Sequence, residues 1–296
     1  MDVSIIVISY NTKDYTKKCL ESIYQKTKDI DFDIYVVDNK SSDGSQEMIK
    51  SNFPQIKLIE NNHNVGFGSA NNQAIKLSIA RYVFLLNPDT FLLNNAIKIL
   101  YDFIDNKGNK GVGCCGGDIF DQDMLPIISH GHFPTLRHII FEFGLNKIFK
   151  SYFINNISDG VANYGYKIKN VQYISGSAML IRREALDKVG LFDEDFFLYY
   201  EETELCYRIF KLGYRIMLVP QAKIIHYMSK SVEKINNEKK IRFQTTGKYL
   251  FFKKSYGTLQ AKIAVLLLII KYSLLTILLR KKDYFIRLKI NIQLFF

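Results

Sequence analysis

The first hundred residues alternate apolar runs rich in β-branched side chains with segments of helical periodicity. Runs typical of strands buried on both faces occur at residues 3–9 (VSIIVIS), 33–38, 56–60 and 82–86 (YVFLL). Segments with helical spacing of apolar residues lie at 14–25, 46–50, 66–80 and 94–103. This order predicts an α/β fold with a mostly parallel central sheet and helices on both of its faces.

Polar residues follow each of the expected strands. They include Tyr10-Asn11, Asp38-Asn39, the segment 61–68 and Asn87-Pro88-Asp89. In parallel sheets, ligands bind at the carboxyl ends of the strands. We therefore expect these polar groups to converge on one edge of the sheet and to form a binding site there.

The pattern changes after residue 105. Strands are expected at 111–117, 171–181 and 215–219, with an extended run at 222–226 and helices at 182–189 and 201–212. The aromatic-rich segment 126–158 has no clear periodicity. We expect two halves of one domain (residues 1–105 and 106–228) and a separate tail (229–296).

Several acidic residues and one histidine could carry chemistry, although each also has a structural explanation. Asp89 could hold a divalent cation or could cap the following helix. Asp38 could accept a hydrogen bond from a ligand or belong to a turn. Glu201 and Glu202 begin a helix, where acids are favoured by the helix dipole, but they follow an unusually aromatic loop. His226 ends an extended apolar run.

Seven segments occur together in an order that resembles glycosyltransferase family 2, in its bacterial rhamnosyltransferase-like branch. They are VSIIVISYN, IYVVDNKSSDGS, NVGFGSANN, FLLNPDT, SGSAMLIRRE, VGLFDEDFFLYYEETELCYRI and VPQAKIIH. The resemblance covers residues 1 to about 228. It implies the GT-A fold, which contains one Rossmann-like unit and binds a nucleotide-diphosphate sugar. Residues 1–105 would then be the nucleotide-sugar-binding half of the domain, and residues 106–228 its acceptor-binding half.

The resemblance also implies roles for individual positions. Nucleotide and donor contacts are expected at Ser9, Tyr10, Asn11, Asp38, Gly66, Phe67, Asn71, Asn87 and Asp89. Donor-sugar or acceptor contacts are expected at Ser175, Gly176, Ser177 and Tyr200. Asp89, with His226, would bind the metal, Mn²⁺ or Mg²⁺. Glu202 would be the catalytic base, with Glu201 as the second candidate.

Two positions depart from the family pattern. Asn87 stands where the first aspartate of the metal-binding DxD motif is expected, so one charge is missing. Glu202 stands where an aspartate is usual, so its carboxylate lies one methylene farther from the backbone. The implied reaction is an inverting transfer in which the acceptor hydroxyl attacks as a base removes its proton.

The net charge of +11 is concentrated in the tail. Residues 230–296 contain 15 Lys and Arg against 3 Asp and Glu. The aliphatic run 263–279 is about 25 Å long as a helix, shorter than the ~30 Å hydrocarbon core, and Lys271 lies near its middle. We expect residues 240–290 to lie on an anionic membrane surface. A membrane span, or packing against the domain or a second subunit, remains open. Nucleic acid explains the charge less well, because no nucleic-acid motif accompanies it.

The resemblance implies an inverting glycosyltransferase of bacterial surface polysaccharide synthesis. The donor expected first is dTDP-rhamnose and next a UDP-sugar, and the acceptor is expected to be a glycan linked to polyprenol. The start of the chain has no signal-peptide pattern, so the expected location is the cytoplasmic face of the membrane. Two alternatives are a nucleotidyltransferase and a catalytically inactive, membrane-associated nucleotide-sugar-binding protein, which the Asn87 departure would favour. Homo-oligomerisation is left open.

Overall fold

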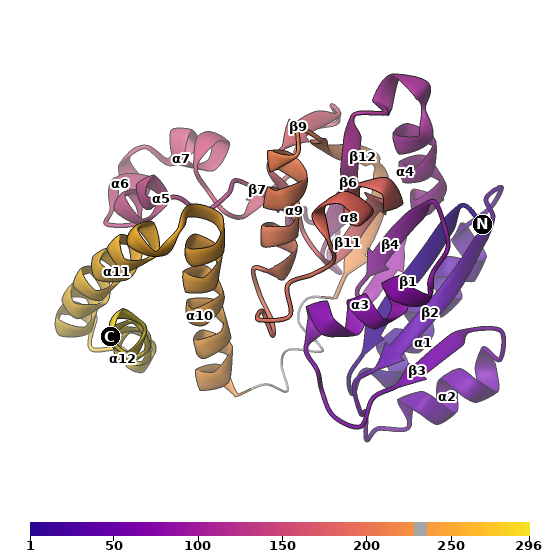
Figure 1. Ribbon diagram of the computed structural model, residues 1–296, viewed down its shortest axis with the longest axis horizontal. Coiled ribbons are helices and arrows are strands. Elements are labelled where there is room, and N and C mark those ends of the chain that lie inside the picture. The colour runs from indigo at the N-terminus through magenta and orange to yellow at the C-terminus, as the bar shows by residue number, and fades with distance from the viewer. Residues whose placement is uncertain (228–235) are drawn as a thin grey trace.

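The computed structural model describes residues 1–227 and 236–296. It contains a mixed α/β domain and, at the end of the molecule away from the N-terminal strands, a group of helices (Figure 1). The expected domain boundary between residues 228 and 229 lies outside the described residues.

The main sheet has the strand order β3-β2-β1-β4-β11-β6-β12-β5, with β9 pairing to β12. Strands β3, β2, β1 and β4 run parallel, as expected, and so do β6 and β12. Strand β11 lies antiparallel between β4 and β6. The strands are β1 (Val3–Ser9), β2 (Phe32–Asp38), β3 (Lys57–Glu60), β4 (Tyr82–Leu86), β5 (Thr90–Leu92), β6 (Val112–Phe120), β9 (Lys169–Val171), β11 (Ala178–Arg182) and β12 (Arg215–His226).

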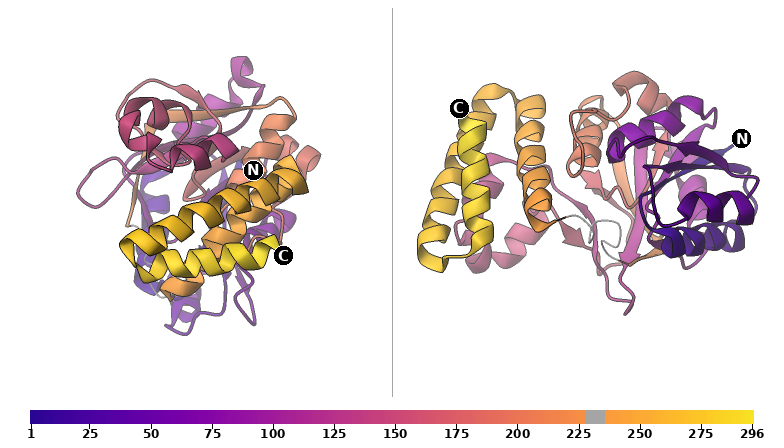
Figure 2. Two further views of the ribbon diagram at one scale, coloured as in Figure 1. Left: turned by 90° about the vertical axis from the view of Figure 1, so that its left-hand side faces the viewer. Right: turned by 90° about the horizontal axis from the view of Figure 1, so that it is seen from below.

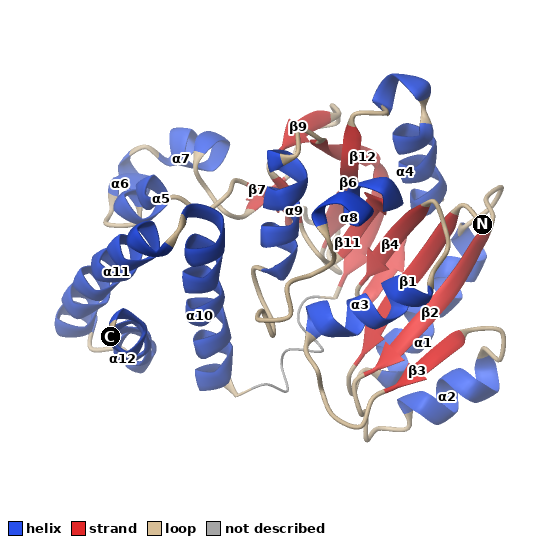
Figure 3. Ribbon diagram, viewed as in Figure 1, coloured by secondary structure: helices blue, strands red, loops and turns tan. Residues whose placement is uncertain are grey.

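The two faces of this sheet pack against two hydrophobic clusters. Successive side chains of a strand point to opposite faces; in β1, Ile5 and Val7 join one cluster, whereas Ile6 and Ile8 join the other. The first cluster lies under α1 (Lys13–Lys26), α2 (Ser45–Asn52) and α4 (Ala96–Asp105). The second lies under α3 (Phe67–Leu77), α8 (Arg183–Val189) and α9 (Glu201–Lys211). Figure 3 shows this layering of helices on strands.

Segment 126–158, which showed no periodicity, forms one strand and short helices. Strand β7 (Ile128–Gly131) pairs with β10 (Tyr173–Ile174) and β8 (Val161–Ala162) in a small antiparallel sheet. Helices α5 (Leu136–Phe141), α6 (Leu145–Ile148) and α7 (Lys150–Asn156) follow β7. A short 3-10 helix, η1 (Lys107–Asn109), precedes β6.

The tail consists of α10 (Asn237–Tyr256), α11 (Thr258–Leu279) and α12 (Lys282–Phe295). It is packed onto the domain: Phe251 and Phe252 of α10 and Ala261 and Leu268 of α11 are buried in the second cluster. Turned by 90°, the molecule shows α11 and α12 on its outer side (Figure 2). Among the described residues, α11 alone is long and apolar enough to cross a membrane, with a mean hydropathy of 2.2.

Candidate functional site

The polar residues that follow the parallel strands do converge at one sheet edge. A cavity of about 110 Å³ lies there, which we call the strand-end cavity. Of the residues expected to bind a nucleotide, Tyr10, Gly66, Phe67 and Asn87 line it. Asn39 and Asn64, which belong to the polar segments expected at this edge, line it as well. Phe197 and Leu198 also line it, and the sequence had not indicated them.

Asp38 ends β2 beside this cavity and is fully buried. Its Oδ1 accepts hydrogen bonds from the Ser41 backbone N–H (2.8 Å) and from Nε2 of Gln46 (2.7 Å). Its Oδ2 is buried and has no hydrogen-bond partner among the described residues. An unsatisfied buried carboxylate oxygen is costly. This oxygen is therefore suited to accept a hydrogen bond from a ligand.

The glycine-rich loop before α3 is tied to the aromatic loop before α9. Gly66 has φ +88°, and a Cβ placed there would lie 2.6 Å from the carbonyl oxygen of Phe197. The Phe67 N–H donates to that same oxygen at 3.0 Å. A side chain at Gly66 would therefore meet both backbone strain and a clash, so glycine is needed to hold the two loops together.

Five of the nine residues expected to bind the nucleotide do not line the strand-end cavity. They are Asp38, Asp89, Ser9, Asn11 and Asn71. The side-chain oxygen of Asn11 accepts from the Ser42 N–H at 2.7 Å, so Asn11 joins the loops that follow β1 and β2. Ser9 and Asn71 are buried. The Ser9 hydroxyl and the Asn71 Oδ1 have no hydrogen-bond partner in the part of the chain that the structure describes.

Asp89 and His226 come together from distant parts of the chain. Nε2 of His226, at the end of β12, lies 3.1 Å from Oδ1 of Asp89 and 3.4 Å from Nδ2 of Asn87. The Asp89 side chain is fully buried, and the Tyr227 N–H donates to its backbone oxygen at 2.9 Å.

This pair fits a divalent cation that is shared with a ligand. No cluster of three or more His, Cys, Asp or Glu side chains that could hold a metal occurs within residues 1–227 and 236–296. A cation bridging to a diphosphate needs only one or two protein ligands, because phosphate oxygens and water complete its coordination. Asp89 and His226 can supply those two ligands.

A second cavity of about 180 Å³ lies next to the first, and we call it the middle cavity. The two share Phe67, Asn87 and Leu198 as lining residues. His226 and the three residues Ser175-Gly176-Ser177 also line the middle cavity. The Ser175 and Ser177 hydroxyls are 3.0 Å apart, so each can orient the other toward a polar ligand.

Glu201 and Glu202 begin α9, and both line the middle cavity. Burial, reinforced by the charge of Glu202, raises the pKa of Glu201 well above its ordinary value, and its buried Oε2 has no partner among the described residues. Burial also raises the pKa of Glu202 to about 7. Of the two, Glu202 therefore has the pKa better matched to proton transfer near neutral pH.

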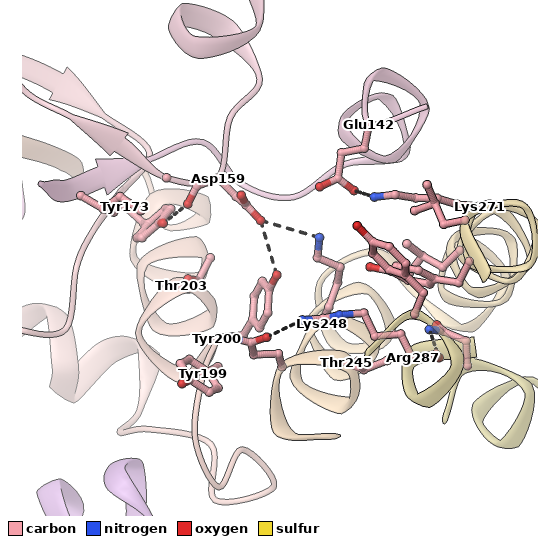
Figure 4. A pocket seen from close by; sticks show the side chains of 18 of the residues that line it. Glu142, Asp159, Tyr173, Tyr199, Tyr200, Thr203, Thr245, Lys248, Lys271 and Arg287 are labelled. Atoms are coloured by element: carbon pink, nitrogen blue, oxygen red, sulfur yellow. Dashed lines mark hydrogen bonds and ion pairs between the residues drawn. The ribbon is translucent and has the colours of Figure 1, made fainter. Parts of the chain in front are cut away.

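A third cavity of about 580 Å³, the tail cavity, lies where the tail meets the domain (Figure 4). Tyr199 and Glu202 line both this cavity and the middle one. Tyr200, expected at the donor-sugar or acceptor site, lines the tail cavity instead of the middle one. Three cationic residues from the tail also line it, Lys248, Lys271 and Arg287, and the sequence reasoning had assigned no site role to any of them.

The fold thus places three adjoining cavities in a row, and Glu202 lines two of them. Comparison with known proteins identifies the family. The family model described as "Glycosyl transferase family 2" matches residues 4–190, more than half of the chain. The chain therefore belongs to glycosyl transferase family 2, and it is a glycosyltransferase.

Similar proteins point to the rhamnosyltransferase-like branch of the family. An N-acetylglucosaminyl-diphospho-decaprenol L-rhamnosyltransferase of Mycobacterium tuberculosis is 24% identical over 241 residues, which cover 77% of this chain and 76% of that protein. Rhamnosyltransferase WbbL of Escherichia coli is 28% identical over 236 residues, which cover 76% of this chain and 83% of that protein.

A solved structure confirms the expected GT-A fold. The mannosyltransferase PcManGT from Pyrobaculum calidifontis, in complex with GDP-Man and Mn²⁺, aligns with a TM-score of 0.58 and 15% identity. The alignment covers 99% of this chain and 84% of that one.

Proposed function

We propose that this glycosyltransferase moves a sugar, with inversion, from a nucleotide-diphosphate donor to a hydroxyl of a lipid-linked glycan. The observation that carries the proposal is the position of Glu202, which lines both the middle cavity and the tail cavity. A base at that junction has a donor sugar on one side and an acceptor on the other. The donor we propose first is dTDP-rhamnose, because a similar protein of Shigella flexneri is described as a dTDP-rhamnosyl transferase. A UDP-sugar is the second candidate.

The strand-end cavity would hold the nucleotide. The unpartnered Oδ2 of Asp38 would accept a hydrogen bond from the base, while Tyr10, Phe67 and the backbone at Gly66 would surround it. The sugar would then lie in the middle cavity beside Ser175 and Ser177. Ser9, Asn11 and Asn71 would support these loops from behind.

Asp89 and His226 would hold a divalent cation against the donor diphosphate. The imidazole nitrogen favours Mn²⁺ over Mg²⁺, because Mg²⁺ takes oxygen ligands. When bound, the cation neutralises the negative charge that builds on the leaving diphosphate. Nδ2 of Asn87 lies 3.4 Å from the same Nε2 of His226, so this contact would be replaced when the nitrogen holds the cation.

The proposed reaction is a single displacement. The acceptor oxygen forms a bond to the anomeric carbon while the bond from that carbon to the phosphate oxygen breaks, and the electron pair leaves with the nucleoside diphosphate. The proton of the acceptor hydroxyl passes to the Glu202 carboxylate. Attack from the face opposite to the leaving group inverts the anomeric carbon.

We also propose that the tail places the enzyme on the cytoplasmic face of an anionic membrane. Helix α11 carries a stripe of exposed apolar side chains at a helical spacing of three to four residues: Leu259, Ile263, Leu266, Ile270, Leu274 and Ile277. The exposed cations Arg280, Lys281 and Lys282 lie at the end of this helix. Apolar side chains flanked by cations suit the interface of an anionic bilayer.

Donor turnover tests the proposal. The protein is mixed with Mn²⁺ and dTDP-rhamnose or UDP-sugars, and release of nucleoside diphosphate is measured with and without a lipid-linked glycan fraction. We expect Glu202→Gln to reduce transfer by about 10²–10⁴-fold. The matched control is Glu184→Gln, which alters a 62%-exposed glutamate on α8. If nucleotide sugars bind but no variant or wild-type protein turns them over, the inactive binding protein becomes the better account.

A further inference from the structure

The tail cavity joins Glu202 to the three helices of the tail. Each helix contributes one cation to its wall: α10 contributes Lys248, α11 contributes Lys271 and α12 contributes Arg287. Figure 4 shows the three side chains around one space, with Glu142 beside Lys271 and Asp159 joined to Lys248. Their convergence depends on the packing of the helices, since 16 or more residues separate them along the chain.

Two of these cations are balanced by the protein itself. Nζ of Lys271 lies 2.8 Å from Oε2 of Glu142, and Nζ of Lys248 lies 3.7 Å from Oδ2 of Asp159. Burial alone lowers the pKa of Lys248, but Tyr200, Glu142 and Asp159 outweigh this effect and raise it above the ordinary value. Lys248 therefore stays charged inside the cavity.

Arg287 has no such balance. Its Nη2 donates to Oε1 of Gln244 at 2.9 Å, and its guanidinium lies 6.0 Å from the centre of the Tyr272 ring. No carboxylate pairs with it among residues 1–227 and 236–296. A half-buried guanidinium that contacts only neutral groups can still accept an anionic partner, and its planar fork suits phosphate oxygens.

The wall around Lys271 is apolar. Leu268 and Leu275 lie one turn before and one turn after Lys271 on α11, and both line the cavity. The cavity thus presents a cationic group between two aliphatic ones. A ligand that fits this wall combines negative charge with a hydrocarbon chain.

We propose that the tail cavity binds the phosphate groups that link the acceptor to its lipid carrier, with Arg287 as the principal contact and Lys248 and Lys271 beside it. This inference rests on the proposed function, which supplies the reason for an acceptor beside Glu202. The acceptor sugar would lie against Glu202 and the isoprenoid against Leu268 and Leu275. The tail would then bind substrate as well as contacting the membrane.

Farnesyl diphosphate is a suitable probe of this site, because it carries a diphosphate on a short isoprenoid. Its binding to the full chain is measured by calorimetry in EDTA. We expect Arg287→Gln to weaken binding by about tenfold to a hundredfold, the range expected for charge-assisted hydrogen bonds. Arg287→Lys, which keeps the charge, is expected to bind more tightly than Arg287→Gln.

Lys289→Met is the matched control, because it removes an exposed cation of the same helix that does not line the cavity. Its affinity for farnesyl diphosphate is expected to stay within about twofold of the wild type. Equal affinity of the wild type and Arg287→Gln would overturn the proposal, provided that the variant unfolds at the wild-type temperature. If Arg287→Gln is unfolded, Lys271→Met is measured in its place, and an affinity equal to that of the wild type overturns the proposal.

Two further ligands identify the source of the phosphate. Farnesol is expected to bind more weakly and to be insensitive to Arg287→Gln. Inorganic pyrophosphate that binds as tightly as farnesyl diphosphate would contradict a lipid-linked ligand. These measurements need no nucleotide sugar, so they can contradict the proposed phosphate site without contradicting the proposed function. The proposed function is contradicted separately, if no donor is turned over.

Discussion

Nε2 of His226 lies 3.1 Å from Oδ1 of Asp89, although 137 residues separate the two in the chain. Asp89 follows β4, and His226 ends β12, two strands whose carboxyl ends meet at the same edge of the sheet. The sheet therefore brings together an oxygen and a nitrogen ligand beside Asn87, where the family usually has a second carboxylate. The proposed metal site thus consists of one carboxylate and one imidazole.

The pH dependence of transfer follows from the environment of Glu202. Burial raises its pKa to about 7, and only the deprotonated carboxylate can accept a proton. We expect kcat/KM to rise with pH to a plateau above pH ~7. Glu202→Gln is expected to remove both the activity and this dependence. A profile that survives in Glu202→Gln but disappears in Glu201→Gln would identify Glu201 as the base.

The raised pKa of Glu202 also predicts a pH-dependent difference in stability between the wild type and Glu202→Gln. The pKa of Glu202 is raised from 4.5 to about 7 in the folded protein, so folding favours its neutral form. As pH rises from ~4.5 to ~7, the unfolded chain loses this proton first, and the folded state loses stability relative to it. Glu202→Gln removes this cost. We expect the variant to be more stable than wild type by about 1–3 kcal/mol at pH 8 and equally stable at pH 4. Denaturant unfolding of the wild type and of Glu202→Gln at the two pH values measures this difference in unfolding free energy. A difference that is the same at pH 4 and pH 8 contradicts the prediction.

Gly66 and Gly213 form a matched pair for testing the loop contact. Their φ angles are +88° and +89°, so alanine adds backbone strain at both positions. Only at Gly66 would the new Cβ clash, at 2.6 Å from the Phe197 oxygen, whereas nothing lies within 4 Å at Gly213. We expect Gly66→Ala to cost about 1–3 kcal/mol more than Gly213→Ala and to weaken nucleotide binding. Equal unfolding free energies for the two variants would show that the loops move apart freely.

Vesicle sedimentation tests the proposed membrane face. We expect binding to phosphatidylcholine vesicles that contain phosphatidylglycerol, weaker binding without it, and loss of binding at high salt. Ile270→Asp removes an exposed apolar side chain of the α11 stripe and is expected to weaken binding about tenfold or more. Ile79→Asp, at an 89%-exposed site on the domain, is the control. Similar binding of both variants and the wild type would place the contact elsewhere.

Much of the fold could be predicted because buried strands have a strong local pattern. The run at 3–9 matches β1, since a strand covered on both faces is apolar throughout. The two extended runs at 215–219 and 222–226 are one strand, β12. Pro220, which lacks an N–H, lies where the register of β12 shifts, and this interruption hid the continuity. Helices α5 to α7 were missed because four to seven residues are too few to show a helical period.

The residues of the candidate site also separate into those that the sequence predicts and those that it does not. Tyr10, Gly66 and Asn87 could be predicted to meet because each follows or adjoins the end of a parallel strand. Lys248 and Arg287 could not, because their positions depend on how three tail helices pack against each other and the domain. Exposed basic residues and cavity-lining ones look alike in the sequence, so the tail was interpreted from its charge and hydropathy alone.

Thermal unfolding with nucleotide sugars is the most direct test of the central claim that the chain binds such a donor through Asp89 and His226. A ligand at a hundredfold excess over its Kd stabilises the folded state by about 2.7 kcal/mol. We predict that a dTDP- or UDP-sugar raises the unfolding temperature in the presence of Mn²⁺. Asp89→Ala should abolish this shift, and His226→Ala should require more Mn²⁺. The control Asp102→Ala, at an exposed aspartate of α4, should behave as wild type. A wild-type protein that no nucleotide sugar stabilises, with or without Mn²⁺, would contradict the account.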